Sequence, residues 1–439
     1  MKSPAFIKRL FAPAAATGSK ADRHTRKTVA LCHALLSERG EASGAALARE
    51  ALAAYRMLSG PGLMAFFDVL AGEFSPDPEA VDQAAYAYRQ DASQTNLIRL
   101  QHVVESPRQE LFRRLNLAAG GTAALVEMRR RVLRDLRAQP HWAGVDADFS
   151  HLLGSWFNRG FLSLQRIDWR TPALVLEKLM QYEAVHEIQG WHDLRRRLES
   201  DRRCFAFFHP ALPDEPIIFI EVALTKGMSD QVQPLLDPDS PVVDTGAADT
   251  AIFYSITNCQ EGLRGISFGN FLIKQVAEDL GREFPRLKTF ATLSPIPGFR
   301  KWLARTAADL PQLAELVDAL TADGWFQRAG PGTRTRAELL RLCAYYLQHA
   351  KQGAEPADAV ARFHLGNGAR LERLNWLADS SDAGMAHSAG MMVNYVYRLK
   401  DVERNHEAYV KEHMVVASPG LSLLARESLL ARLKTGRKV

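Results

Sequence analysis

The sequence predicts an α+β protein in which an all-helical N-terminal domain precedes a mixed-sheet domain. Up to about residue 139, apolar residues recur at three and four spacing and β-branched runs are nearly absent, which is typical of helices. Beyond about residue 168, short runs rich in β-branched and aromatic residues follow, with one strong helix among them. We therefore expect a helical domain over residues 1–168 and a sheet domain over residues 169–439.

The helical domain is indicated by its apolar spacing and by the breakers between its helices. Residues 29–36 and 111–117 carry the helical repeat, and the stretches SGPG at 59–62 and SPDP at 75–78 separate helices. The chain of 439 residues is 47% hydrophobic, which suffices for more than one core. No motif of chemical interest lies in this first domain.

The sheet domain is predicted from strand-like runs and the order in which helices separate them. The expected strands cover residues 204–208, 216–224, 251–256, 287–293 and 391–397. The expected helices cover residues 173–182, 191–198 and 268–280, and much of 297–350. The first three strands follow one another as a meander, and one helix then crosses from the third strand to the fourth. This order predicts a mixed sheet and not a doubly wound one.

Charge and cysteine usage exclude several classes of protein. The formal net charge of +5 is a mild excess, and the arginine runs at 129–131 and 195–197 lie among acids, so we interpret them as solvated helix faces and expect no nucleic-acid binding. The four cysteines form no CxxC pair, which excludes a Cys-rich zinc site and suggests a reducing compartment. No apolar run approaches the roughly 18–20 residues of a membrane helix.

The two ends of the sequence bear on localisation. Residues 1–27 are rich in lysine and arginine and contain one acid, Asp22. We interpret this segment as a basic arm, with a mitochondrial transit peptide as the alternative. The final residues, Gly436 to Val439, do not form a peroxisomal signal.

A glycine-containing loop before the strong helix is the first candidate site. Glycines let the backbone approach a ligand, and the helix N-terminus adds a positive field, so the loop suits a phosphate. A tight turn with the serine as N-cap remains an equal alternative. The loop is not a Walker A motif, because no Gly-Lys-Ser/Thr follows. It consists of Arg264, Gly265, Ile266, Ser267, Phe268, Gly269 and Asn270.

Two further segments carry candidate acid–base residues. Ser294 follows a strand within Thr-Leu-Ser-Pro-Ile-Pro-Gly-Phe, whose prolines and glycine fix the chain at the strand's C-terminal end. His364 lies in Phe-His-Leu-Gly-Asn-Gly-Ala, which we interpret as a glycine-flanked loop where a histidine can titrate near neutrality. Taken alone, each is more commonly a structural residue, a turn serine and a loop histidine.

These motifs together resemble a known family. The order of strand, R-G-x-S-x-G loop, helix and strand is similar to the acyl-CoA site of the GNAT-type acetyltransferase fold, with residues 251–256 and 287–293 as its splayed strands. The segments YEAVH at 182–186, RCFAFFHP at 203–210, QEGLRGISFG at 260–269 and LSPIPGF at 293–299, with FHLGNGA at 363–369 and NWLAD at 375–379, resemble the malonyl-CoA decarboxylase family. The likeness is strong over about residues 168–410 and weak in the helical domain.

This resemblance implies roles for individual residues. The family's catalytic serine falls on Ser294, its catalytic histidine on His364, and its CoA loop on residues 264–270, although some relatives carry an acid where this chain has Ser267. The family tyrosine falls on Tyr397, or on Tyr395 if the register shifts. The resemblance also implies a homotetramer assembled through the helical domain, in a bacterial cytoplasm or a mitochondrial matrix.

The reaction implied is the conversion of malonyl-CoA to acetyl-CoA and carbon dioxide. We expect no metal and no cofactor, because the thioester carbonyl is itself the electron sink. His364 is the expected proton donor, since an unperturbed histidine has a pKa of about 6.5. The alternatives are a CoA-dependent N-acyltransferase of the same fold and a non-catalytic acyl-CoA sensor. Malonyl-CoA supplied alone distinguishes the three, because only a decarboxylase would release carbon dioxide.

Overall fold

Two compact units share the chain unevenly. The computed structural model describes residues 20–434 except 39, 267, 269–271 and 323. One unit takes residues up to 161 with segments 210–213 and 260–267, and the other takes 162–209, 214–259 and 268–439. Residues 162–168, which we assigned to the helical domain, lie in the second unit, because the strand within them pairs with the sheet.

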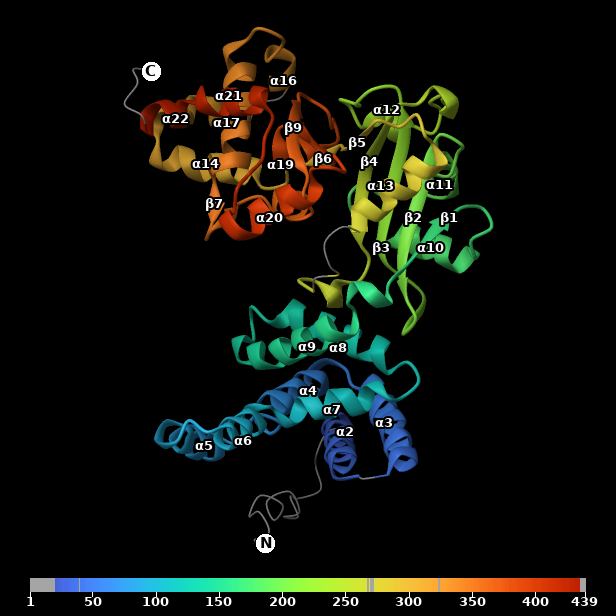
Figure 1. The fold of residues 1–439 in the computed structure, drawn as a ribbon, viewed down its shortest axis with the longest axis vertical. Helices are drawn as coiled ribbons and strands as arrows, with labels where there is room; N and C mark the ends of the chain where they lie inside the picture. The colour runs from blue at the N-terminus through green and yellow to red at the C-terminus, as the bar shows by residue number, and fades with distance from the viewer. Residues whose placement is uncertain (1–19, 39, 267, 269–271, 323, 435–439) are drawn as a thin grey trace. The chain divides into compact units, whose positions relative to one another are not determined.

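The first unit is helical, as the sequence predicts (Figure 1). Its core is aromatic: Phe66, Phe67 and Trp142 are buried, and Phe112 stacks on Phe149 with ring centroids 4.1 Å apart. Its elements are α2 (Lys20–Ser37), α3 (Glu41–Arg56), α4 (Gly60–Gly72), α5 (Pro78–Gln90), α6 (Gln94–Val104), α7 (Pro107–Asn116), α8 (Gly121–Asp135), η1 (Pro140–Trp142), α9 (Ala143–Trp156), η2 (Arg159–Phe161) and η4 (Glu261–Leu263).

The second unit is built on an eight-stranded mixed sheet. Its strands run in the order β1-β2-β3-β4-β5-β10-β6, and β9 also pairs with β10. Strand β4 is parallel to β5, whereas β10 is antiparallel to β5, β6 and β9. The strands are β1 (Ser163–Ile167), β2 (Arg202–His209), β3 (Leu212–Thr225), β4 (Thr250–Asn258), β5 (Thr289–Thr292), β6 (Ser294–Pro295), β9 (Arg370–Asn375) and β10 (Met392–Val396), with a separate hairpin of β7 (Lys351–Gln352) and β8 (Glu355–Pro356).

Helices cover the sheet and extend beyond it (Figure 1). Helices α10 and α11 bury Leu176, Leu179 and Leu194 against Ala206 and Phe219 of the sheet. The second unit contains α10 (Ala173–Tyr182), α11 (Trp191–Arg197), α12 (Gln233–Leu236), η3 (Thr245–Ala247), α13 (Leu272–Glu283), α14 (Phe299–Asp309), η5 (Pro311–Leu313), α15 (Ala314–Ala319), α16 (Trp325–Arg328), α17 (Arg334–His349), α18 (Ala359–Gly366), α19 (Asp382–Ser388), α20 (Val402–Glu412), α21 (Pro419–Arg426) and α22 (Leu429–Lys434).

All five predicted strands are confirmed, and the structure adds elements that the sequence did not indicate. Strands β1 and β9 were missed, because most residues of each are polar or charged and give no apolar strand pattern. The short helix α12 interrupts the predicted meander between β3 and β4. The mixed character of the sheet is confirmed, because β4 pairs with β5 in parallel and with β3 in the antiparallel direction.

Candidate active site

Ser294, His364 and Tyr397 meet in one hydrogen-bonded cluster, although they are far apart in the sequence. Ser294 Oγ lies 3.0 Å from His364 Nε2, and His364 Nδ1 lies 2.8 Å from the hydroxyl of Tyr397. Ser294 Oγ also donates to Thr292 Oγ1 at 2.8 Å. All four side chains are buried. A buried serine, histidine and tyrosine in series can pass a proton along the row.

Ser294 is held where strand β5 gives way to a short strand and a turn. Strand β6 pairs with β10, with Ser294 opposite Val393. The turn that follows ends at Gly298, where an added Cβ would lie 2.1 Å from the hydroxyl oxygen of Tyr346. The glycine therefore allows the turn to pack closely against α17, and the predicted position of the serine at the end of a strand is confirmed.

His364 lies in the last turn of helix α18, so our interpretation of this segment as a loop is wrong. The side chain of Asp358 caps the helix and accepts from the N–H groups of Val360 and Ala361, each at 3.0 Å. The helix ends at Gly366, and Gly368 follows with φ of +81° and no space for a side chain beside Val402. The glycines that suggested a loop in fact terminate a helix.

Asp358 also connects the segments that carry Ser294 and His364. Its second oxygen accepts from the hydroxyl of Tyr346 at 3.3 Å, and the N–H of Gly298 donates to the same carboxylate. Burial raises the pKa of Asp358. One carboxylate thus fixes both the helix that carries His364 and the turn that follows Ser294. An Asp before Ala359 and Val360 is an N-cap signal that could have predicted this helix from the sequence.

The two candidate tyrosines play different parts. The hydroxyl of Tyr397 contacts His364 Nδ1, whereas the ring of Tyr395 stacks on the imidazole with centroids 4.5 Å apart. Both face α18, because they are two residues apart at the end of β10. Burial raises the pKa of each phenol well above its usual value. The geometry therefore favours Tyr397 as the tyrosine that hydrogen-bonds His364. Tyr395 packs its ring against the imidazole.

Burial governs the electrostatics of His364. The imidazole is 3% exposed, and burial lowers its pKa to about 3. The sequence suggested a histidine that can titrate near neutrality, whereas burial moves the pKa of His364 well below that range. A neutral imidazole has one N–H donor and one acceptor nitrogen, so each of its two hydrogen bonds has a defined direction.

A cavity of about 230 Å³ opens beside this cluster. The pairing of β4 with β5 stops after Phe253 and Thr292, and the rest of β4 runs on without β5. Strands β4 and β5 therefore part as the resemblance to the acetyltransferase fold implies. The cavity is lined by the end of β4 and by the segments that carry Ser294 and His364, with Val185 beside them. The lining residues are Val185, Phe253, Tyr254, Ile256, Asn258, Ser294, Pro295, Ala359, Val360, Phe363 and His364.

Glu183 shapes one wall of this cavity, and we did not identify it from the sequence. Its buried carboxylate accepts from the main-chain N–H groups of Val185 and His186 and from the hydroxyls of Ser255 and Thr257. These bonds fasten the YEAVH segment to β4 and hold Val185 in the cavity wall. The five-residue motif therefore has a structural role, because it fixes a segment of the cavity wall to β4.

The predicted CoA loop is described in part. Ser267, Gly269 and Asn270 lie outside the described residues, while Ile266 and Phe268 are buried. Arg264 and Gly265 form the centre of a type II turn, in which the N–H of Ile266 donates to the carbonyl of Leu263 and Gly265 has φ of +79°. The glycine at 265 is therefore required by the turn, and the side chain of Arg264 is exposed.

Helix α8 of the helical unit holds this loop, which we did not expect. Arg129 Nη1 donates to the carbonyls of Gly262 and Arg264, both at 2.9 Å, and Arg129 Nε pairs with Asp146. A Cβ at Gly262 would lie 2.0 Å from the carbonyl oxygen of Val126 in α8. The loop and the helix are packed backbone to backbone.

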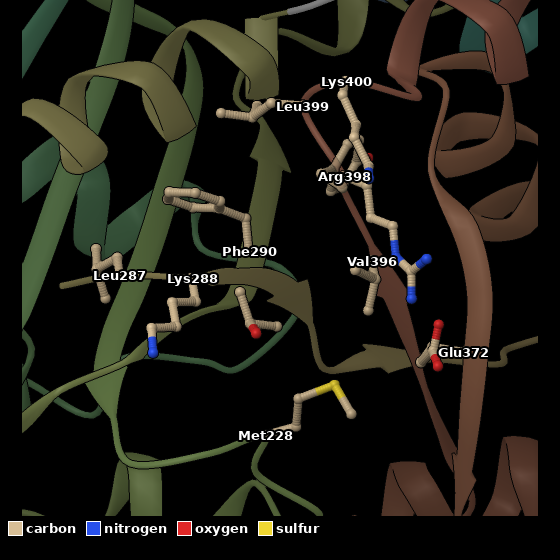
Figure 2. A pocket seen from close by; sticks show the side chains of 11 residues that line it. Met228, Leu287, Lys288, Phe290, Glu372, Val396, Arg398, Leu399 and Lys400 are labelled. Atoms are coloured by element: carbon tan, nitrogen blue, oxygen red, sulfur yellow. The ribbon is translucent and has the colours of Figure 1, made fainter. Parts of the chain in front are cut away.

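A larger cavity, of about 650 Å³, lies where the start of β5 and the end of β10 separate (Figure 2). Lys288, Arg398 and Lys400 contribute positive charge and Glu372 a negative one (Figure 2). Phe290 and Val396 contribute apolar surface (Figure 2). Tyr397 lines this cavity, but Ser294 and His364 line the smaller one. The smaller cavity is therefore the one beside the Ser294–His364 contact.

The described residues contain neither a candidate metal site nor a candidate membrane-spanning helix. Among them, no group of three or more His, Cys, Asp or Glu side chains could hold a metal ion. Within the same residues, no helix is both long and apolar enough to cross a membrane.

Known proteins resemble this chain along most of its length. The family model of the malonyl-CoA decarboxylase C-terminal domain matches residues 160–435, and that of the N-terminal domain matches residues 74–157. The mitochondrial malonyl-CoA decarboxylase of Anser anser anser is 38% identical over 339 residues, which cover 70% of this chain and 67% of that protein.

Solved structures agree with these matches. The crystal structure of malonyl-CoA decarboxylase from Rhodopseudomonas palustris is 50% identical with a TM-score of 0.86, and covers 92% of this chain and 99% of its own. That of malonyl-CoA decarboxylase from Agrobacterium vitis is 48% identical with a TM-score of 0.85, and covers 91% and 99%.

Proposed function

The chain belongs to the malonyl-CoA decarboxylase family and is a carboxy-lyase that acts on malonyl-CoA, and on that premise we propose that Ser294, His364 and Tyr397 carry the reaction. The observation that supports this assignment is their unbroken row of hydrogen bonds beside the cavity at β4. Two of the three, Ser294 and His364, line that cavity and can touch a bound acyl group.

Decarboxylation breaks the bond between C2 of the malonyl group and its carboxylate carbon. The electron pair passes to the thioester carbonyl and forms an enolate as carbon dioxide leaves, and C2 then takes up one proton. Ser294 hydrogen-bonds the departing carboxylate or the thioester oxygen. In the free protein the proton of Ser294 points to Thr292, so it turns to the substrate oxygen on binding, where a donor to a developing oxyanion lowers a barrier by about 3–4 kcal/mol. The apolar wall of Phe253, Ile256 and Phe363 favours loss of the charged carboxylate as neutral carbon dioxide.

His364 supplies the proton to C2, and Tyr397 supports it from the opposite ring nitrogen. For each carbon dioxide released, C2 gains one proton from His364 and one proton from solvent restores the row. Because burial keeps the ring neutral, His364 donates its single N–H proton and regains another through Tyr397. General acid catalysis by a positioned group typically contributes about 10²–10⁴-fold.

Incubation with malonyl-CoA alone tests the assignment against the acyltransferase and sensor alternatives. The wild-type protein releases carbon dioxide and acetyl-CoA without any acceptor amine. Ser294→Ala and His364→Asn lose this release while keeping their melting temperature, and the matched surface variant His192→Asn keeps it. Folded Ser294→Ala and His364→Asn enzymes that retain wild-type turnover would contradict the proposed roles.

The loop of residues 264–270 is proposed to hold the CoA pyrophosphate. The exposed guanidinium of Arg264 beside a glycine turn suits a phosphate. Arg264→Ala should raise KM for malonyl-CoA with little change in kcat, whereas Arg264→Lys should raise it less. Equal binding of CoA by the wild-type protein and Arg264→Ala, measured by calorimetry, would refute the contact.

A homotetramer formed through the helical domain is proposed from exposed apolar side chains. Tyr86, Ile98 and Val104 on α5 and α6 are 58%, 50% and 50% exposed. Ile98→Asp should lower the mass measured by light scattering, whereas Leu423→Asp, at an equally exposed apolar site on α21, should not. An unchanged mass for Ile98→Asp would contradict this interface.

A bacterial cytoplasmic location is also proposed, with the mitochondrial matrix as the alternative. The similar solved structures come from bacteria and the curated relatives are mitochondrial. Cell fractionation with an antibody to the chain distinguishes the two compartments.

A further inference from the structure

Thr292 accepts two hydrogen bonds directly behind the proposed active site. It is the last residue of β5 and has no exposed surface. The main-chain N–H of Tyr395 donates to its Oγ1 at 3.1 Å, and Ser294 Oγ donates to the same oxygen at 2.8 Å. The N–H of Tyr395 can only donate, so it occupies one lone pair of the threonine oxygen, and Ser294 donates to the other.

The proton of Ser294 determines the direction of every other bond in the row. A serine hydroxyl has one proton, and here it points to Thr292. At the 3.0 Å contact with His364, Ser294 Oγ must therefore accept, so Nε2 must carry a hydrogen. A neutral imidazole has a single N–H, so Nδ1 accepts from the hydroxyl of Tyr397 at 2.8 Å.

We propose that Thr292 is a positioning residue that orients this row of hydrogen bonds from Tyr397 through His364 and Ser294 to Thr292. This orientation keeps the transferable N–H of His364 on Nε2, the ring nitrogen beside Ser294. In the reverse orientation Ser294 would donate to Nε2, and the proton would reside on Nδ1, next to Tyr397. The proposal rests on the proposed function only in giving this N–H a role in turnover, because the orientation itself is a property of the free protein.

The threonine side chain suits a matched pair of variants. Thr292→Val keeps the shape and removes the oxygen, and Thr292→Ser keeps the oxygen and removes the methyl group. In Thr292→Val the proton of Ser294 is free to turn to Nε2, so the imidazole should change to the Nδ1–H form. In Thr292→Ser the orientation should persist.

The experiment reads the tautomer of His364 by ¹⁵N NMR of histidine-labelled protein without substrate, with the signal assigned by its absence in His364→Asn. We expect the Nε2–H form in the wild-type protein and in Thr292→Ser, and the Nδ1–H form in Thr292→Val. We also expect Thr292→Val to lose about tenfold in kcat with KM nearly unchanged, on the scale of one lost hydrogen bond, and Thr292→Ser to recover it.

An Nδ1–H tautomer in the wild-type protein would overturn the proposal without any variant, so it is testable even if Thr292→Val fails to fold. A Thr292→Val protein that keeps the Nε2–H form and the wild-type kcat would overturn it as well. Failure of the proposed function looks different: Ser294→Ala and His364→Asn would then remain active, whatever tautomer the wild-type spectrum shows.

Discussion

Acidification should leave His364 uncharged in the free enzyme. Burial lowers the pKa of this imidazole to about 3. At about pH 5.5 such a group is protonated in about 0.3% of molecules, whereas a histidine with the ordinary pKa of about 6.5 is protonated in about 91%. The difference between the two pKa values corresponds to about 5 kcal/mol against the imidazolium in the folded protein.

The assay follows the imidazole signal of His364 from about pH 8 to about pH 5.5 in labelled protein, and urea-unfolded protein gives the reference titration near 6.5. We expect a flat signal in the folded state, and a pH profile of kcat/KM without a step from His364, because that profile reports the free enzyme. Between the folded-state pKa of about 3 and the unfolded-state pKa of about 6.5, the unfolded chain binds more protons at His364 than the folded protein does. The free energy of unfolding therefore has its full contribution from this group above about pH 6.5 and loses it as the pH falls toward 3.

A folded-state titration of His364 with a midpoint near 6.5 would refute this reasoning. It would mean that water or a charged group reaches the ring in solution, and that the imidazolium is available as a general acid before substrate binds. The deduction that Nε2 carries the only N–H would then fail at neutral and lower pH.

Four further outcomes follow from the site. Ser294→Ala and His364→Asn should each lower kcat by about 10²-fold or more, and the double variant should be little worse, because the two act as one unit; additive losses would contradict this. Asp358→Ala should lower Tm and kcat together, since loss of an N-cap costs about 1 kcal/mol, and an unchanged melt would refute the capping role. Lys288→Ala should leave KM for malonyl-CoA within about twofold, because an exposed charge outside the substrate site contributes little; a large rise would place substrate in the larger cavity. Turnover should survive EDTA, and a loss that one added metal restores would disprove the cofactor-free reaction.

The sequence predicted the sheet well where strands are apolar and poorly where they are not. The runs that became β2, β3 and β4 are almost wholly buried, so their composition alone identifies them. Strand β9 is mostly polar and places Glu372 next to Arg373, so neither its composition nor its period identifies it. The segment of helix α18 was predicted as a loop from its glycines, because the N-cap at Asp358 was not recognised in the sequence.

The residues of the candidate site could be predicted from the sequence, but the hydrogen bonds among them could not. Ser294, His364 and Tyr397 were identified through resemblance to a family, and their contacts join residues 70 and 33 positions apart. Thr292 has no local signal, because a threonine in a strand is an ordinary β-former. The neutrality of His364 depends on burial by segments that the sequence does not show to be adjacent.

The packing of Gly262 and Arg264 against helix α8 limits how this protein can be divided or recombined. A chimera joined near residue 168 would take its helices from one parent and its CoA-loop residues from the other, and so would pair Arg129 with a foreign backbone. Recombination between distant relatives should therefore yield active enzymes mainly when residues 126–129 and 262–264 are inherited together. For design, the practical unit of exchange is this discontinuous pair of segments, so a sheet unit expressed alone would lack the helix that residues 262–264 pack against.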